Sequence, residues 1–372
     1  MKKLETDQIS PLQYMFSIAC FIQSSSLLSS FFLPVTQQES WLCVAVGLAI
    51  GIPLFLIYNS LMKAYPDKNI IQINETVYGR AGGIVVSLIM LWYFLSVTTY
   101  NLRDIGYLVK QTIMVDTPVL VIMVLCLLVC AYGIYHGLRV ITRYAMAFSM
   151  LASFILIVGT LLTLNQWELD NFLPMFSQPP LHYVQGTNQV LTIPFGEIVI
   201  YLMIAPQVKR GKKGMLRYLI GGLLIGAVTV LIVVARDVAV LGNTVSLFTL
   251  PSFETLRMVT LTQTLSRMEI LFTVVLIMLL FFKIMVLYYI SVLALAQLFK
   301  LQSYKPLILI LGAFFTAYSY IVHTSTVQHA VFSREYAPIL WAVFEYVIPL
   351  LTLVLGRLRG LPQKSGLQRG TT

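Results

Sequence analysis

One short stretch carries the residues best suited to chemistry in this sequence. Pro194-Phe195-Gly196-Glu197 interrupts an apolar run over residues 190–205. Proline removes a backbone donor and clashes with the preceding turn, and glycine permits unusual dihedral angles. A carboxyl group at this place is costly unless protein or water shields it. A broken helix beside a charge is typical of the solute sites that membrane proteins build near the bilayer midplane.

A counter-charge for Glu197 is available in Lys283, which lies midway along the apolar residues 266–298. Opposite charges in one membrane bundle tend to pair or to face water. Two alternatives stay open for Glu197: it pairs with Lys283, or it senses ligand or carries a proton. Lys283 is correspondingly either a functional cation or a structural partner.

A polar cluster in the first apolar segment forms a second candidate break. Gln23, Ser24, Ser25 and Ser26 lie at mid-depth of residues 11–33. Half-helices that begin at such breaks expose backbone amides, which favour an anionic group such as a carboxylate. We therefore expect both breaks to bind ligand. The alternative is that the serines only ease close helix packing.

Tyr100 and Asn101, near Asp104 in the third apolar segment, are further candidates for the same cavity. Tyrosine more often lies in interfacial belts or in cores than on a ligand. The histidines are scattered along the sequence, and their spacing indicates no metal site. We expect neither a metal nor a cofactor.

Composition sets the class of protein. The chain is 58% hydrophobic and 11% charged, with a mean hydropathy of +0.84, whereas about a quarter of the residues of a soluble domain are charged. This is an all-α polytopic membrane protein. It has no nucleophile elbow, phosphate-binding loop or metal-ligand spacing, so we expect no enzyme activity. The net charge of +10 reflects basic loops, and we expect no nucleic-acid partner.

Hydropathy predicts ten membrane spans, each near or above the roughly 20 residues that a bilayer requires. They cover residues 11–33, 41–61, 83–109, 117–135, 141–164, 187–206, 216–240, 266–298, 305–323 and 338–357. We expect one transmembrane domain over residues 1–360, with halves at about 9–164 and 187–357. Residues 361–372 form a short polar tail.

The basic residues predict the orientation of the chain. Most of the 25 Lys and Arg residues fall at the termini and in the even-numbered loops, including residues 209–217. By the positive-inside rule, both termini and this loop face the cytoplasm. The candidate breaks in the first and sixth spans are five spans apart, so the two halves would have opposite topology. Interrupted spans in matching positions of inverted halves are a sequence sign of a transporter-type site.

Several of these features together resemble the B subunit of bacterial spore germinant receptors. The motifs that carry the resemblance are Pro194-Phe195-Gly196-Glu197, Leu250-Pro251-Ser252-Phe253, Arg267-x-Glu269, Leu102-Arg103-Asp104 and Thr117-Pro118. The resemblance covers nearly the whole chain. Relatives commonly carry glycine in the first-span break, where this chain has serines.

That family is similar to permeases of the amino acid–polyamine–organocation superfamily. The resemblance implies a five-plus-five inverted repeat with broken first and sixth helices. It also implies a nutrient-binding subunit of the inner spore membrane that works with an A subunit and a lipoprotein C subunit. Lys283 would supply a fixed cation where sodium-coupled relatives of the fold hold an ion. The alternative function is an autonomous amino-acid secondary transporter, with Glu197 as the candidate for proton coupling.

Overall fold

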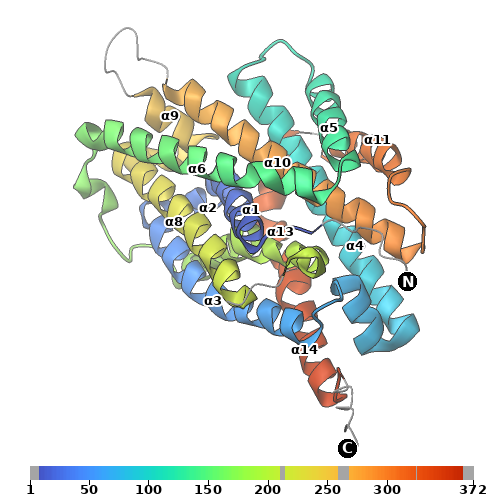
Figure 1. Cartoon of the computed structure of the whole chain (residues 1–372). Coiled ribbons are helices and arrows are strands. Elements are labelled where there is room, and N and C mark those ends of the chain that lie inside the picture. The colour runs from blue at the N-terminus through green and yellow to red at the C-terminus, as the bar shows by residue number, and fades with distance from the viewer. Residues whose placement is uncertain (1–7, 210–213, 259–267, 324, 363–372) are drawn as a thin grey trace, which may run out of the picture.

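The structure is a computed structural model that describes residues 8–209, 214–258, 268–323 and 325–362. The described elements are helices that pack side by side, and the outer helices surround a few central ones, among them α1 (Figure 1). Arg267 and most of the predicted tail lie outside the described residues.

The predicted spans are confirmed as helical segments. Six described stretches are long and apolar enough to cross a membrane: Leu33–Ala64, Ile70–Thr112, Leu138–Gln166, Met215–Leu247, Met268–Leu298 and Thr326–Leu358. Two shorter apolar helices, α5 (Val119–Tyr135) and α11 (Leu307–Ile321), account for the fourth and ninth spans. The first and sixth spans are interrupted and supply the remaining two.

The long helices are α3 (Ser40–Ala64), α4 (Ile70–Thr112, interrupted at Gly79), α6 (Leu138–Thr163), α8 (Met215–Leu241) and α10 (Met268–Leu298). The tenth span runs through α12 (Thr326–Val331), η9 (Phe332–Tyr336), α13 (Ala337–Ala342), η10 (Val343–Val347) and α14 (Ile348–Leu358). The short connecting helices are η2 (Gln37–Glu39), η3 (Leu164–Gln166), η4 (Leu169–Phe172), η8 (Gly242–Leu247) and α9 (Pro251–Arg257).

The third span begins close to the predicted residue 83. A short helix over residues 70–78, capped by Asn69 and Gln72, precedes it, but Gly79 has non-helical angles (φ +79°, ψ 177°). The chain folds back there, since a Cβ atom at Gly83 would lie 2.5 Å from the Glu75 Cα.

It is the tenth span that begins earlier than hydropathy predicts. The tenth starts at Thr326 rather than at residue 338, with Ser325 accepting a hydrogen bond from the Gln328 amide. Side-chain caps carry no hydropathy signal, which explains this difference.

The first span breaks at the predicted serines. Helix α1 (Pro11–Ser24) passes into a 3₁₀ turn, η1 (Ser25–Leu28), and then into α2 (Ser29–Thr36). The hydroxyl of Ser24 donates to the Phe21 carbonyl at 2.5 Å, a back-bond that bends helices. The span is tightened here rather than fully unwound.

The sixth span breaks at the predicted proline. Helix α7 (Pro180–Val190) gives way to a π-helical turn, η5 (Leu191–Phe195), which holds Pro194. A 3₁₀ segment, η6 (Gly196–Met203), follows, and η7 (Ala205–Gln207) ends the span. Proline cannot donate to the preceding turn, so the α-helical pattern fails at this place.

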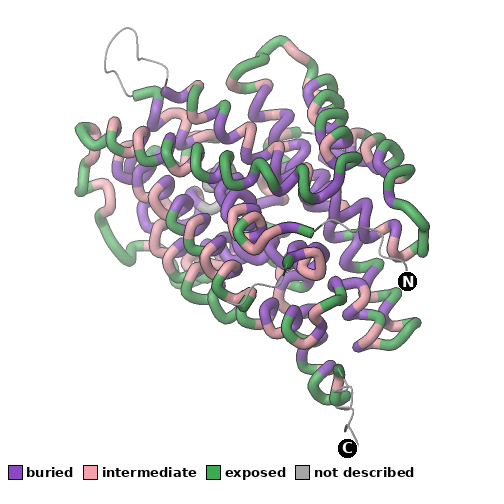
Figure 2. Tube along the Cα trace, viewed as in Figure 1, coloured by how far each residue is buried: buried purple, intermediate pink, exposed green. Residues whose placement is uncertain are grey.

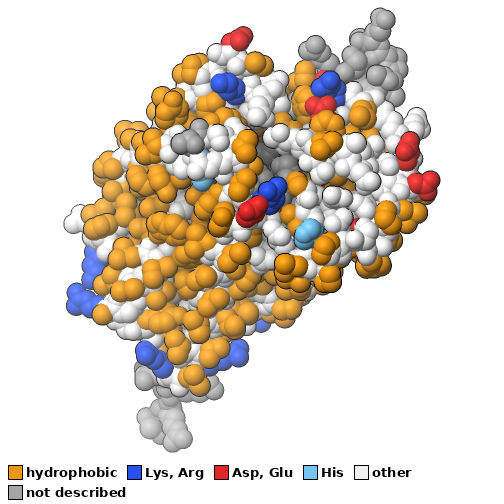
Figure 3. All heavy atoms as spheres, turned by 180° about the vertical axis from the view of Figure 1, so that it is seen from behind, with side chains coloured by type: hydrophobic (Ala, Val, Ile, Leu, Met, Phe, Trp, Pro, Cys, Tyr) orange, Lys and Arg blue, Asp and Glu red, His pale blue; other side chains and the backbone are white. Residues whose placement is uncertain are grey.

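The broken spans lie in the core. Helix α1 packs against α6, α8 and α10, and buried residues concentrate inside the bundle while exposed ones lie outside (Figure 2). Side chains on the outer face are mostly apolar (Figure 3), as expected of a surface that contacts lipid. In that view basic side chains lie around the lower end, where α14 lies, and also in the upper half, whereas the acidic ones lie in the upper half.

A strand-like contact joins the start of the first span to the end of the sixth. The Ile9 amide donates to the Gln207 carbonyl at 3.0 Å, and the Lys209 amide donates to the Ile9 carbonyl at 2.9 Å. The two broken spans therefore have neighbouring ends on one side of the bundle.

Candidate functional site

Lys283 joins the two broken spans. Its Nζ atom lies 2.5 Å from Glu197 Oε2 in the sixth span and 2.9 Å from Ser25 Oγ in the first. The ammonium also lies 4.7 Å from the centre of the Phe21 ring, a cation–π distance. Lys283 is fully buried and Glu197 is 3% exposed. A single buried cation thus connects the first, sixth and eighth spans.

The sixth-span motif surrounds this ion pair. Pro194, Phe195, Gly196 and Glu197 are all buried. A Cβ atom added at Gly196 would lie 2.1 Å from Glu345 Oε2, so only glycine permits this approach. The motif therefore fixes the backbone against the tenth span as well as presenting the Glu197 carboxylate.

The residues of the first-span cluster have different surroundings. Gln23 Nε2 lies 3.0 Å from the hydroxyls of both Ser153 and Thr229, on helices α6 and α8. Ser24 bonds within its own helix, as described above. Ser26 borders two small cavities of about 20 and 10 Å³, each near the size of one water molecule. Ser25 is thus the residue of this cluster with a bond to Lys283.

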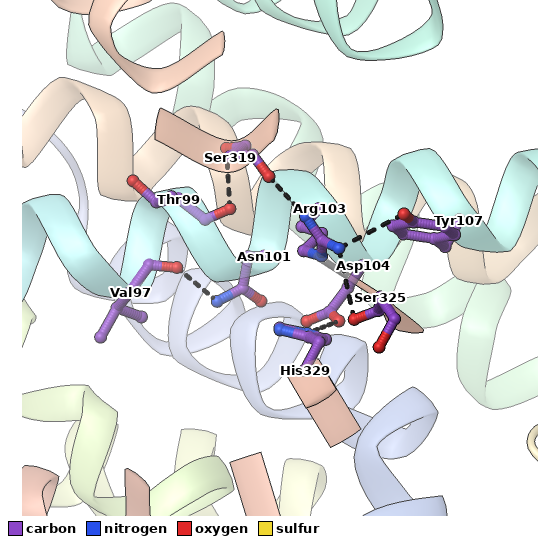
Figure 4. A network of polar contacts seen from close by, with 9 residues as sticks. All are labelled: Val97, Thr99, Asn101, Arg103, Asp104, Tyr107, Ser319, Ser325 and His329. Carbon is purple, nitrogen blue, oxygen red and sulfur yellow. Dashed lines mark hydrogen bonds and ion pairs between the residues drawn. The ribbon is translucent and has the colours of Figure 1, made fainter. Parts of the chain in front are cut away.

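The predicted third-span residues lie in separate contacts. Asn101 Nδ2 donates to the Val97 carbonyl of its own helix at 2.8 Å (Figure 4). Tyr100 stacks on His323 and Phe332, with ring centres 5.5 and 5.3 Å apart. These contacts put Tyr100 in an aromatic cluster with residues from the end of α11 and from the tenth span.

A polar network adjoins this aromatic cluster (Figure 4). His329 Nε2 lies 2.8 Å from Asp104 Oδ1, and Arg103 donates to the Ser319 carbonyl at 2.8 Å. His323 lies beside them, outside the spans, with its ring centre 5.2 Å from that of His329. Burial, with the neighbouring His329 and Arg103, lowers the pKa of His323 to about 4. Sequence spacing did not reveal that these two histidines meet.

Sequence reasoning missed Glu345, although the signal was present as a lone carboxyl group inside the tenth span. Glu345 is fully buried, and its Oε1 atom accepts a hydrogen bond from the Tyr93 hydroxyl at 2.6 Å. The Tyr58 hydroxyl lies 2.9 Å from the Glu345 carbonyl oxygen and 3.1 Å from that of Gly196. The second, third, sixth and tenth spans therefore meet around Glu345.

The arrangement has the chemistry of a solute site rather than of an active site. Two buried carboxyl groups, one ammonium and several hydroxyl groups surround the point at which both broken spans lose their α-helical pattern. Such groups can exchange their present partners for the polar groups of a small ligand, because buried ionisable residues in membranes are functional candidates by default.

Residues 8–327 match the family described as spore germination protein. Spore germination protein KB of Bacillus subtilis (strain 168) is 26% identical over 365 residues, which cover 95% of each chain. The putative spore germination protein YfkT of the same strain is 25% identical over 326 residues. That match covers 87% of this chain and 89% of the relative.

Solved transporter structures share the fold. The structure of Mhp1, a nucleobase-cation-symport-1 family transporter in a closed conformation with bromovinylhydantoin bound, has a TM-score of 0.68 at 14% identity. It matches 93% of this chain and 78% of its own. MhsT in complex with L-phenylalanine has a TM-score of 0.65 at 13% identity, and the match covers 94% of this chain and 99% of MhsT. The likeness confirms the predicted inverted-repeat transporter fold with its broken first and sixth helices. By its sequence and its fold, the chain belongs to the spore germination protein family of multi-pass membrane permeases.

Proposed function

We propose that this protein is the membrane subunit of a spore germinant receptor. It binds a small nutrient, an amino acid or a similar solute, between the first-span and sixth-span breaks. Binding triggers germination together with an A subunit and a lipoprotein C subunit in the inner spore membrane. Both termini face the spore core, which corresponds to the cytoplasm.

The observation that carries this proposal is the bridge from Lys283 to Ser25 and Glu197. A ligand that enters between the breaks must disturb this bridge, because the ammonium fills the junction of the three spans. Binding is thereby linked to the relative position of the first and sixth spans. A receptor needs such a link to pass a signal to its partners.

The proposed ligand follows from the groups at the junction. Lys283 offers an ammonium to a ligand carboxylate, and the Glu197 and Glu345 carboxyl groups offer acceptors to a ligand amine. An α-amino acid carries both groups on one carbon atom. The likeness to MhsT, which was solved in complex with L-phenylalanine, agrees with this class of ligand.

A germination assay tests the receptor function. Spores that lack the gene are complemented with wild type, Ser25→Ala or Ser25→Phe and exposed to single nutrients. We expect wild type to restore the response to at least one nutrient. Ser25→Phe should weaken it at normal protein abundance, because its ring would fill the junction, and Ser25→Ala should have a smaller effect. An equal response from all three proteins would assign Ser25 to helix packing.

The second candidate, an autonomous amino-acid transporter, is favoured by the fold shared with Mhp1 and MhsT. Purified protein in liposomes, without partner subunits, distinguishes the two functions. Uptake of a labelled amino acid that Lys283→Met abolishes would support the transporter. A protein that binds the amino acid without uptake would support the receptor.

A further inference from the structure

Glu345 has the surroundings of a protonated carboxyl group. An ionised carboxylate only accepts hydrogen bonds and offers about four lone-pair sites. Glu345 receives one side-chain donor, the Tyr93 hydroxyl at 2.6 Å, and its Oε2 atom has no hydrogen-bond partner among the described residues. Burial of an ionised group without partners is strongly unfavourable.

Glu39 provides an internal comparison, since it is equally buried. Its two carboxylate oxygens accept from the amides of Phe176 and Ser177 at 2.8 and 2.9 Å and from the Ser177 hydroxyl at 3.0 Å. The Tyr183 hydroxyl adds a fourth donor at 2.5 Å. This chain therefore surrounds an ionised buried carboxylate with donors on both oxygens. Glu345 lacks that environment.

The charges around Glu345 lead to the same conclusion. The titratable groups that face it are Tyr58 on α3, Tyr93 on α4, Glu197 on the sixth span, Lys283 on α10 and Tyr346 on its own span. Lys283 is the one cation of this set, and it forms its ion pair with Glu197. An ionised Glu345 would leave a buried, unbalanced negative charge, whereas a proton on Glu345 makes the group neutral.

The free oxygen of Glu345 lies at the sixth-span break. The position that a Cβ atom of Gly196 would take is 2.1 Å from Oε2 and 3.1 Å from the Leu191 carbonyl oxygen. A proton on Oε2 is thus held beside the backbone that a ligand must move. We infer that Glu345 is the proton-binding site of this protein, neutral while the break is closed and ionised when the break opens.

The step is a simple dissociation. Opening of the break admits water, the O–H bond of the Glu345 carboxyl group breaks, and the proton passes to that water. The carboxylate left behind is free to pair with a cationic group such as a ligand ammonium. This coupling to ligand rests on the proposed function, but the proton on Glu345 in the closed protein does not.

Infrared spectroscopy of the purified, ligand-free protein at neutral pH tests the proton directly. A protonated carboxyl group has a C=O stretch separate from the carboxylate bands. We expect Glu345→Gln to lose such a band, and Glu39→Gln to keep it. Glu345→Asp, which retains a carboxyl group, should shift the band and covers the case in which Glu345→Gln fails to fold. A spectrum in which neither Glu345 variant alters a protonated-carboxyl band overturns the inference.

A pH-indicator dye in weakly buffered solution then tests the coupling, with a mixture of the natural L-amino acids as the probe. Wild type should release a proton on addition of the mixture, and a folded Glu345→Gln protein should release none. Equal release from both proteins overturns the assignment of Glu345. Loss of the infrared band without any release from wild type supports the proton on Glu345 and counts against the proposed amino-acid ligand.

Discussion

The ion pair between Lys283 and Glu197 answers one of the alternatives that the sequence left open. The two groups lie 2.5 Å apart and are almost wholly buried. Removal of one partner from a buried pair leaves the other charge without compensation, at a cost of about 3–5 kcal/mol. Replacement of both partners by neutral groups avoids that cost.

A double-mutant cycle therefore has a definite expected outcome. Glu197→Gln and Lys283→Met should each lower the melting temperature of the purified protein, and the double variant should recover much of the loss. Glu335→Gln is the control, since the exposed pair of Glu335 with Arg334 is worth about 0–1 kcal/mol. Additive losses in the double variant would show that the two residues do not act as a pair.

His323 predicts a pH dependence of stability. Its pKa is about 4 in the folded protein, against an ordinary value of about 6.5. The unfolded chain therefore binds a proton that the folded chain excludes, so this contribution is present above pH 6.5 and is lost as pH falls toward 4. Melting curves at a series of pH values should show a smaller decline for His323→Asn. An identical decline in both proteins would assign the effect to other groups.

The sequence identified the chemistry of the site better than its geometry. Glu197 and Lys283 were recognisable as lone charges in apolar segments, and Pro194 as a break. The bridge from Lys283 to Ser25 could not be predicted, because helical periodicity gives the face of a residue on its own helix but not the rotation of one helix against another. The same limit applies to Tyr100, which the sequence suggests for the cavity of Glu197 and Lys283. Its ring packs against His323 and Phe332.

Among the helices, the close approach of α1 to α8 depends on two glycines. A Cβ atom at Gly222 would lie 2.7 Å from the Met15 carbonyl oxygen, and one at Gly226 would lie 2.4 Å from Ile22 Cβ. Small residues four apart allow such contacts in membranes. This packing holds α1 in the core, where its serine break meets Lys283.

Neighbouring glycines on α8 provide a matched test. Gly222→Ala should destabilise the protein by about 1–3 kcal/mol, as overpacking typically does, because the added methyl group would clash with the Met15 carbonyl oxygen of the α1 backbone. The methyl group of Gly221→Ala would meet only the flexible Met15 side chain, with Sδ at 2.8 Å and Cγ at 3.4 Å, so this change should cost much less. Thermal unfolding of the two variants in the same detergent measures the difference, and equal melting temperatures would argue against close packing at Gly222.

Hydropathy predicted the existence and the order of the spans, because the length of each apolar run is set by the bilayer. It placed the start of the tenth span too late, since Ser325 begins this helix through a side-chain hydrogen bond. The breaks were predictable from Pro194 and from the serine cluster. Their local form could not be predicted, because it depends on packing: the sixth span has a π-helical turn and the first a 3₁₀ turn.

For the molecule as a whole, the distribution of basic residues predicts which end faces the cytoplasm. Met175, in the loop before α7, and Lys209, after the sixth span, are both exposed. In a cysteine-free background, an impermeant thiol reagent on intact cells should label Met175→Cys. It should label Lys209→Cys only after permeabilisation. The reverse pattern would invert the proposed orientation.

The backbone contact at Ile9 has a consequence for the direction of motion. Two backbone hydrogen bonds join the start of the first span to the end of the sixth. A displacement of one span at that end would therefore carry the other with it. At the opposite end α2 packs against α7. Glu39 accepts hydrogen bonds there from the Phe176 and Ser177 amides of the loop before α7 and from the Tyr183 hydroxyl of α7. Those bonds can open without breaking a helix. With the proposed orientation, the joined ends lie on the cytoplasmic side and the ends that can separate lie on the outer side, so a ligand would reach the junction from outside.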